Sequence, residues 1–311
     1  MSNIPGFSKI FGLGDRTTAD LFNDYVEITE KVDGSQFSFG TVDGEVVMRS
    51  KNCSVHLNDG NKMFTKAAQY AHALHDAGLL SDYPGYVFHA EYLNSPRHNS
   101  LEYDRVPKNH FALYAVRRPD GSLIEDYDKV AAIAGILNID VAPLLYRGKL
   151  SDAPGYLPEK HYEWLNQLID KTSFLGKAKM EGCVIKRYGD VLIAGVMQPA
   201  LCGKHVSDQF KETHKIAWKA DNPTNIEKLA AALKTDARWH KGVQRMRDDG
   251  VLTGTLKDIG PLIGVVSRDV VDEEKEWIKE ELWRLFKGDV MRIATSGIPD
   301  WYKAQLQQAT E

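Results

Sequence analysis

The stretch VEITEKVDGSQFSFG, residues 26–40, constrains the fold of this chain more than any other. Apolar and polar residues alternate at its start, which is typical of a β-strand with one buried face. The strand stops on a Glu-Lys pair, Asp33-Gly34 supplies a tight turn, and alternation then resumes as a second strand. Lys31 is therefore predicted at the inner end of a strand, although lysine is rarely buried.

A second Asp-Gly pair predicts a β-hairpin directly afterwards. Residues 36–50 read QFSFGTV-DG-EVVMRS, with alternation on both sides of Asp43-Gly44. Helical spacing of apolar residues follows over residues 62–79, and helices are also expected around 126–137 and 158–170. Further strands are expected at residues 86–92, 110–116, 141–146, 182–187 and 191–197.

The tail changes character after residue 220. Amphipathic helices are expected at residues 226–233, 271–286 and 301–308. The sequence therefore predicts an α+β domain over residues 1–220 and a small all-α domain over residues 221–311. A chain of 311 residues with 43% hydrophobic content suits this division and can build a real core.

Composition gives expectations about cellular location and about the role of the cysteines. No apolar stretch approaches the length of about 18 residues that a membrane helix needs, and the N-terminus lacks a secretory layout, so a cytoplasmic location without membrane partners is expected. The three cysteines are widely spaced, which favours buried thiols over a disulfide framework or zinc site.

A net charge of −4 argues against a protein that coats nucleic acid over its whole surface, but it allows a local basic groove. Basic residues cluster in two regions of the sequence. For each residue taken alone, an ordinary solvated surface charge is at least as good an explanation as a nucleic-acid contact. These residues are Arg97, Arg105, Lys108, Arg117 and Arg118, then Lys204, Lys211, Lys215 and Lys219.

Four more stretches follow the Lys-Val-Asp-Gly tetrapeptide in a fixed order. They are Arg49-Ser50, FHAEYL with Glu91, HFALYAV with Phe111, and MEGCVIKR with Glu181 and Lys186. Together the set resembles the ordered motifs of the covalent nucleotidyltransferases, the superfamily of ATP-dependent polynucleotide ligases and mRNA capping enzymes. The resemblance implies an ATP-grasp-like ligase domain of antiparallel sheets with flanking helices.

Lys31 is the candidate nucleophile under this resemblance. An amine must be neutral when it attacks, whereas free lysine has a pKa of about 10.4. Burial and nearby positive charge from a divalent cation or a second lysine lower a lysine pKa by several units. A depressed pKa is therefore expected for Lys31 when the divalent cation is bound.

The resemblance assigns the nucleotide site residue by residue. Glu30, Gln36, Arg49, Glu91, Phe111 and Lys204 are implied to bind ATP. Among these, Arg49 contacts phosphate, Glu91 binds the ribose hydroxyls, and Phe111 stacks on the purine, with Tyr114 as the alternative if the strand register differs. For Glu91 a structural salt bridge, and for Phe111 core packing, are the competing readings.

The same resemblance gives Glu181 to the catalytic metal, expected to be Mg²⁺ or Mn²⁺. Lys186, with Arg49, is implied to contact the RNA phosphates. The family usually closes its domain with two lysines spaced K-x-K, but here Cys202 stands where the partner of Lys204 is expected. Lys215 and Lys219 remain alternatives.

A helical tail instead of an oligonucleotide-binding barrel resembles the RNA ligase 2 type of bacteriophages, as does the closing SGIPDWYKAQL. The expected activity is ATP-dependent joining of RNA 5′-phosphate and 3′-hydroxyl ends through lysyl-AMP and RNA-adenylate, by a monomer, in RNA repair. The substrate could be a nicked duplex or a broken tRNA. A DNA ligase of unusual architecture, a capping-type nucleotidyltransferase and a nucleic-acid-binding module without chemistry are the alternatives.

Overall fold

The computed structural model describes residues 4–57, 63–99, 101–207 and 225–308. The chain forms two compact units. The first combines Met1–Glu212 with Asp236–Ser267, and the second combines Thr213–Thr235 with Arg268–Glu311. Lys211, Lys215, Lys219 and the expected boundary at residue 220 lie outside the described residues.

The first unit contains two β-sheets. The five-stranded sheet has the order β1-β11-β10-β2-β9, and the six-stranded sheet has the order β5-β4-β3-β6-β7-β8. All pairs are antiparallel except β1 with β11 and β7 with β8. The strands are β1 (Phe11–Gly12), β2 (Val26–Lys31), β3 (Ser35–Val42), β4 (Glu45–Ser50), β5 (Ser54–Val55), β6 (Val87–Tyr92), β7 (Phe111–Arg117), β8 (Asp140–Val141), β9 (Leu144–Gly148), β10 (Gly182–Ile193) and β11 (Val196–Val206).

Helices flank the sheets and continue into the second unit. The α-helices are α1 (Thr65–Asp76), α2 (Tyr127–Ile136), α3 (His161–Ile169), α4 (Asn225–Leu233), α5 (Asp236–Asp248), α6 (Ile259–Ala294) and α7 (Ile298–Gln308). Short 3₁₀ turns lie at Arg16–Thr18, Lys108–His110, Leu150–Asp152, Pro158–Lys160 and Leu256–Asp258. The predicted α+β class, with flanking helices and a helical C-terminal region, is confirmed, and the sheets are two in number.

The predicted hairpin of residues 36–50 is confirmed as β3 and β4. Asp43 and Gly44 both have positive φ, 53° and 82°, which is what a two-residue turn between right-twisted strands requires. The turn therefore sets the register that places alternate side chains of β3 on opposite faces of the sheet.

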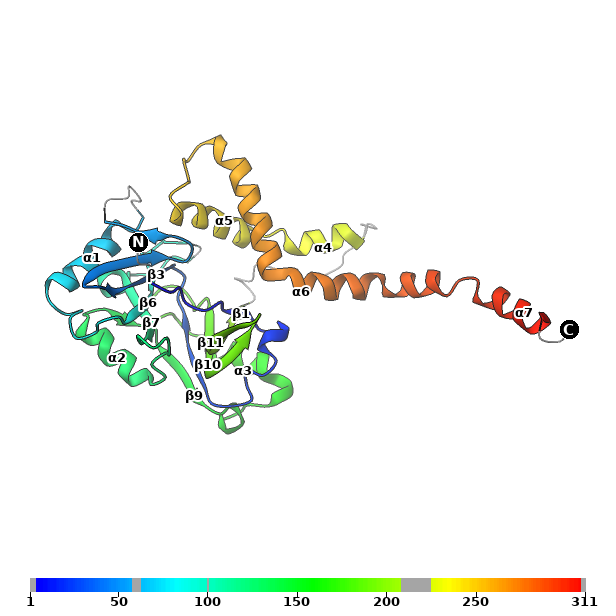
Figure 1. The fold of residues 1–311 in the computed structure, drawn as a ribbon, viewed down its shortest axis with the longest axis horizontal. Coiled ribbons are helices and arrows are strands. Elements are labelled where there is room, and N and C mark those ends of the chain that lie inside the picture. The colour runs from blue at the N-terminus through cyan, green and yellow to red at the C-terminus, as the bar shows by residue number, and fades with distance from the viewer. Residues whose placement is uncertain (1–3, 58–62, 100, 208–224, 309–311) are drawn as a thin grey trace. The chain divides into compact units, whose positions relative to one another are not determined.

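Helices α1 and α2 cover one face of the six-stranded sheet (Figure 1). Ala67, Ala71 and Leu74 recur at helical spacing and are all buried, so one stripe of α1 faces the sheet. They pack with aromatic side chains of β3 and β6, including Phe37 and Phe88. This core covers one face of the sheet, and the other face meets the five-stranded sheet.

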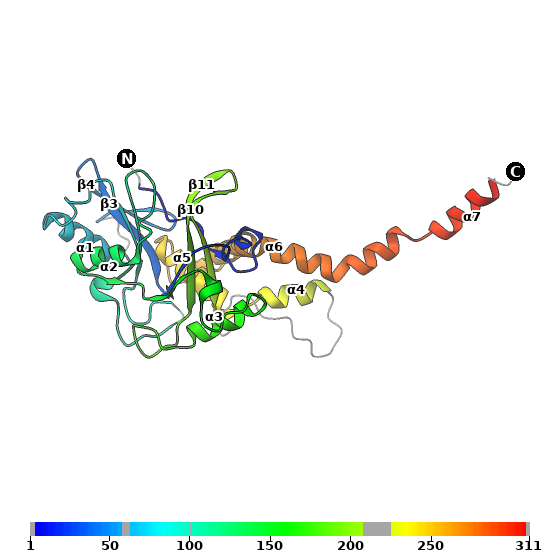
Figure 2. The ribbon, with the colours of Figure 1, turned by 90° about the horizontal axis from the view of Figure 1, so that it is seen from below.

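Two predicted strands were wrong in their extent. The run 191–197 is the tip of the long β10–β11 hairpin (Figure 2), because Ala194 and Gly195 adopt φ of 50° and 81° and reverse the chain. The run 141–146 divides into β8 and β9, since Pro143 lies between them and cannot donate to a ladder.

The helix α5 was missed by the sequence patterns. Its buried face carries Arg238, Gly242, Gln244 and Met246, so no apolar stripe marks it. In the described part of the chain, no helix has both the length and the apolar character that crossing a membrane demands.

Candidate active site

Strand alternation divides the candidate side chains of the six-stranded sheet between its core face, which α1 and α2 cover, and its inner face, which meets the five-stranded sheet. On β6, Phe88, Ala90 and Tyr92 enter the core beneath α1 and α2, so His89 and Glu91 face the other way. The five-stranded sheet meets this inner face: Lys186 Nζ on β10 donates to the carbonyl of Tyr114 on β7, at 2.6 Å.

Lys31 lies at the end of β2 and contacts Glu181. Gly182 of β10 pairs with Lys31, so Glu181 precedes the pairing and reaches the amine, with Nζ to Oε2 at 2.5 Å. The lysine side chain is 26% exposed and the glutamate 15%. Two motifs 150 residues apart therefore meet in one ion pair.

The side chains of the protein by themselves raise the pKa of Lys31. Burial alone would lower it, but the negative charges of Glu181, Asp33 and Glu91 and the hydrogen bond to Glu181 together outweigh burial. The expected depression of this pKa therefore depends on the positive charge of a bound cation, which has to outweigh these carboxylates. Without added positive charge, the amine is held as an ammonium ion.

The pKa values of two surrounding acids are raised as well, which for a carboxyl group favours the neutral form. Burial raises the pKa of Glu91 to about 8 and that of Glu181 to about 7, although Lys31 opposes both shifts. Asp33 is instead fixed by hydrogen bonds, from the Leu101 N–H at 2.8 Å and from Asn99 Nδ2 at 2.9 Å. The group thus holds more acid than one ammonium can neutralise.

This excess of carboxylate suits a divalent cation. Among the described residues, no set of three or more His, Cys, Asp or Glu side chains is arranged to hold a metal alone. Magnesium and manganese commonly take only one or two protein carboxylates, with water and substrate phosphate as their other ligands. Glu181, beside Lys31, fits a metal site that needs the substrate to complete it.

Gly34 lets the Lys-Val-Asp-Gly turn lie against β6. A Cβ atom at this position would come within 2.7 Å of the Tyr92 carbonyl oxygen and 2.8 Å of Glu91 Cγ. No side chain fits such a space. The glycine therefore allows the turn that follows Lys31 to lie close to Glu91.

Glu30 does not belong to the group formed by Lys31 and the carboxylates that act on it. Its carboxylate accepts from Ser173 Oγ at 2.5 Å and from the Phe174 N–H at 3.2 Å, and it is buried. Lys31 and Glu30 are adjacent in one strand and so point to opposite faces. Glu30 anchors the loop at residues 173–174.

Phe111 also lies away from the group. Its ring is fully buried beneath α1 and packs against Phe37, Phe39 and Tyr92, with centroid separations of 5.5, 5.6 and 5.6 Å. Tyr114 is on the inner face, where it is half-buried and its ring centroid lies 5.0 Å from that of Phe7. Burial and the charge of Glu91 raise the pKa of Tyr114.

Gln36 and Arg49 occupy the inner face of the same sheet. Gln36 pairs with Glu91 across β3 and β6. Arg49 donates to the carbonyls of Ile4, Ser50 and Lys51 at 3.1, 3.2 and 3.3 Å. Its guanidinium thus orders the N-terminal segment.

Lys186 is enclosed, with 1% of its side chain exposed. Its amine lies 3.2 Å from Glu27 Oε1, and Tyr188 Oη donates to the same oxygen at 2.9 Å. The predicted contact from Lys186 to RNA phosphate would require this pair to open.

Lys204 lies on β11 opposite Val184, and its charge lowers the pKa of Glu181. The neighbouring Cys202 is buried, which raises the pKa of its thiol to about 12, so it is neutral and does not replace a lysine cation.

Replacing Lys186 with methionine is expected to lower the free energy of unfolding by about 3–5 kcal/mol, because Glu27 would keep a buried charge without its cation. Adding Glu27→Gln should restore much of that loss. Urea unfolding measures both, with Lys160→Ala, an exposed pair with Glu163, as the control expected to change stability by less than about 1 kcal/mol. A stable Lys186→Met protein that loses only RNA joining would instead support a phosphate contact.

A set of hydrogen-bonded residues near the Lys-Val-Asp-Gly turn was not marked by any sequence motif. Ser35 Oγ donates to Asp248 Oδ2 of α5 at 2.7 Å and lies 3.0 Å from His98 Nε2. Gln244 Nε2 donates to Asp248 Oδ1 at 2.6 Å. These partners are up to 213 residues apart, so no local pattern could reveal them.

Solved structures similar to this chain come from Naegleria gruberi RNA ligase. The complex with pyrophosphate has a TM-score of 0.49 and 13% identity, and it covers 68% of this chain and 58% of that chain. A lysine-to-alanine variant with ATP and Mn has the same score and identity and covers 68% and 59%. The match therefore spans less than two thirds of the length of those ligases. Among curated proteins, none matches the chain.

A protein-family model described as RNA ligase matches residues 24–194, more than half of the 311 residues. The matched range contains Lys31, Glu91 and Glu181, the three residues that the structure brings together. The chain belongs to the RNA ligase family.

Proposed function

We propose that this RNA ligase uses ATP to join RNA 5′-phosphate and 3′-hydroxyl ends through a lysyl-AMP intermediate. The observation that carries the proposal is the position of Lys31, at a strand end beside Glu181 and within the electrostatic reach of Asp33 and Glu91. A lysine amine in a group of carboxylates that suits a divalent cation is the arrangement that covalent nucleotidyl transfer requires.

The reaction would proceed in three transfers. Lys31 Nζ attacks the α-phosphorus of ATP, a P–N bond forms, and the bond to the bridging oxygen breaks as pyrophosphate leaves. The RNA 5′-phosphate then takes the AMP from Lys31. Finally the RNA 3′-hydroxyl attacks the adenylated 5′-phosphate and displaces AMP.

Lys31 must lose a proton before it attacks. The carboxylates around it favour the ammonium form. A divalent cation held by Glu181 would supply the positive charge that lowers the pKa of Lys31 and stabilises the α-phosphate oxygens. Lys204, whose charge already acts on Glu181, would add to this effect.

The remaining side chains would bind the nucleotide. Glu91 and Gln36 lie opposite each other on neighbouring strands, and Glu91 is the candidate for the ribose hydroxyls. We assign the stacking role on adenine to Tyr114 and not to Phe111, because only Tyr114 lies on the same face as Glu91. Arg49 would contact phosphate after one of its hydrogen bonds to a backbone carbonyl breaks and the freed donor turns to the phosphate.

The test is incubation of the protein with α-labelled ATP and Mg²⁺ or Mn²⁺. We expect AMP on the protein through a bond that acid cleaves and alkali spares, as in a phosphoramidate. Labelled GTP in its place would indicate a capping-type enzyme. With nicked duplexes, sealing of an RNA nick but not of the matched DNA nick distinguishes an RNA ligase from a DNA ligase, and no labelling would reject the proposal.

The finer assignment, to the RNA ligase 2 type, is supported by the helices of the C-terminal region. A monomer acting on a nicked duplex or a broken tRNA is part of the same proposal. The finer assignment implies a division of labour in which residues 1–220 form lysyl-AMP and residues 221–311 help to align the RNA ends.

A chain ending at residue 220 is expected to accept AMP yet fail to seal an RNA nick, since alignment of reactants contributes on the order of 7 kcal/mol or more. A chain ending at residue 267, which keeps the part of the helical region that belongs to the first unit, is the comparison. Gel analysis of labelling and sealing measures both. Sealing at the full-length rate by the shorter chain would contradict the division.

A further inference from the structure

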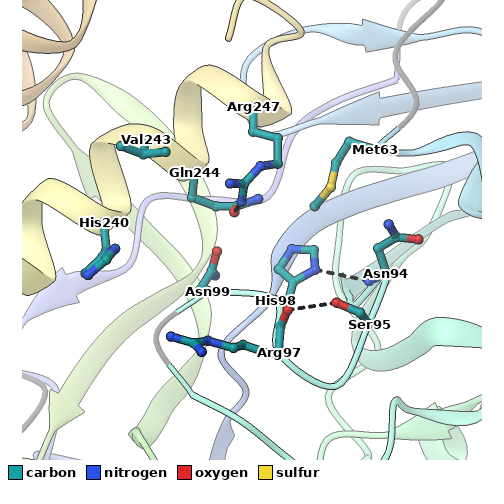
Figure 3. Close-up of a pocket in the computed structure, with 10 residues that line it drawn as sticks. All are labelled: Met63, Asn94, Ser95, Arg97, His98, Asn99, His240, Val243, Gln244 and Arg247. Atoms are coloured by element: carbon teal, nitrogen blue, oxygen red, sulfur yellow. Dashed lines mark hydrogen bonds between the residues drawn. The ribbon is translucent and has the colours of Figure 1, made fainter. Parts of the chain in front are cut away.

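A polar cavity of about 360 Å³ lies beside the Lys-Val-Asp-Gly turn, between α5 and the loop after β6 (Figure 3). The side chains that line it include Arg97, His98, Asn99, His240, Gln244 and Arg247. None of them belongs to the motifs of the nucleotide site. The cavity is large enough for a nucleotide unit and is mostly polar, so an apolar ligand does not suit it.

Helix α5 and the loop after β6 each place a positively charged side chain at the cavity. Figure 3 shows Arg247 reaching in from α5 and Arg97 from the loop, with Asn99 between them. Both arginines are exposed. In the described part of the chain, the guanidinium of Arg97 makes no ion pair or hydrogen bond, and that of Arg247 bonds only to the Gln244 amide oxygen. Both retain donors for an anion.

The carboxylates nearby are already satisfied. Asp33 accepts from Asn99 and Leu101, and Asp248 accepts from Ser35 and Gln244. The imidazole of His98 accepts from the Asn94 N–H at Nδ1 and faces Ser35 at Nε2. This network positions the walls of the cavity and leaves the two guanidiniums as its available charges.

Asn99 provides an unusual acceptor. Its Nδ2 donates to Asp33 Oδ1 and to the Gly34 carbonyl, both at 2.9 Å, which fixes the orientation of the amide. Its Oδ1 is buried and has no hydrogen-bond partner among the described residues. A ligand with a hydroxyl or amine group that reaches this acceptor would supply the missing donor.

We infer that this cavity binds a phosphodiester and the adjoining nucleotide of the RNA strand, next to the site of adenylyl transfer. The inference rests on the proposed function and adds a subsite to it. Arg97 and Arg247 contact the phosphate, and Asn99 Oδ1 accepts from a ribose hydroxyl or base amine.

Pyrophosphate or the tail of ATP is the other source of phosphate. A triphosphate tail carries several negative charges, and Asp33 and Asp248 border the cavity at hydrogen-bonding distance from its walls. The single negative charge of a phosphodiester matches two guanidiniums flanked by carboxylates better. A triphosphate also has no donor for Asn99.

The experiment measures the Kd of the full-length protein for a fluorescent 5′-phosphorylated oligoribonucleotide, without ATP and at several salt concentrations. The double variant Arg97→Ala/Arg247→Ala is expected to raise Kd about tenfold or more. The slope of log Kd against log salt should fall by about 0.7 for each phosphate that the variant no longer neutralises. Arg97→Lys/Arg247→Lys should restore most of the slope.

Two controls make the result specific. Arg147→Ala removes an exposed arginine that pairs with Asp128 elsewhere in the same unit, and it should leave Kd unchanged. The ATP requirement for AMP labelling should also be unchanged in the double variant. Unchanged RNA binding in that variant overturns the inference, as does an equal loss with Arg147→Ala. A raised ATP requirement with unchanged RNA binding would assign the cavity to the triphosphate.

RNA binding and labelling are separate readouts. Failure of the unsubstituted protein to label with ATP would count against the proposed function, whereas the inferred subsite is decided by the RNA Kd of the arginine variants.

Discussion

Replacement of Lys31 by alanine is expected to abolish AMP labelling, with a loss on the order of a thousandfold or more, because removal of a nucleophile leaves no atom for the P–N bond. Lys31→Arg should fail equally. Arginine keeps the positive charge and can pair with Glu181, but its guanidinium does not deprotonate near neutral pH. Labelled ATP with gel analysis gives the measurement.

Folding can be separated from chemistry in this experiment. Lys31→Ala leaves Glu181, Glu91 and Asp33 without their cation, so a modest change in stability accompanies the loss of activity. Lys31→Arg keeps that charge, and a native circular dichroism spectrum for it would isolate the chemical effect. Lys129→Ala, an exposed lysine on α2, is the control that should label normally. Full labelling of either Lys31 variant would exclude this residue as the nucleophile.

The parts of the fold that local chemistry decides were predictable. The Asp43-Gly44 pair requires positive φ and produced the expected hairpin, and helical spacing located α1 and α2. The long β10–β11 hairpin was misread because its turn begins with Ala194, a residue that rarely adopts positive φ. Helix α5 was missed because it buries arginine and glutamine.

In the candidate site too, some features were predictable from the sequence and others were not. Lys31, Glu91 and Glu181 come together as motif order implied. The network of Ser35, His98 and Asp248 depends on contacts between distant segments, which no pattern of spacing encodes. The pKa of Lys31 likewise depends on how many carboxylates the fold gathers around it, which the sequence motifs do not give.

For Phe111, strand alternation in the sequence already argued against the stacking role. A spacing of twenty residues after Glu91 suggested the stacking role, but strand alternation separates the two side chains. Glu91 pairs with Ala112 and Tyr92 pairs with Phe111, so Phe111 shares the core face with Tyr92. Tyr114 lies on the opposite face, beside Glu91.

This placement predicts opposite effects for two aromatic residues on one strand. Tyr114→Ala is expected to raise the ATP concentration for half-maximal labelling about tenfold or more, because a stacked base contributes about 1–3 kcal/mol. Tyr114→Phe keeps the ring and should be mild. Phe111→Ala should leave the ATP requirement of the folded protein unchanged and lower its free energy of unfolding by about 3–5 kcal/mol, since it empties a buried site among Phe37, Phe39 and Tyr92.

Urea unfolding and ATP titration of the same preparations measure the two effects independently. If Phe111→Ala does not fold, Phe111→Leu retains most of the buried volume and should show a smaller loss of stability with normal ATP dependence. The assignment fails if Phe111→Leu raises the ATP requirement while Tyr114→Ala does not. That result would mean that β7 changes its register when ATP binds, because Phe111 cannot reach the face of Glu91 while it is paired as it is here.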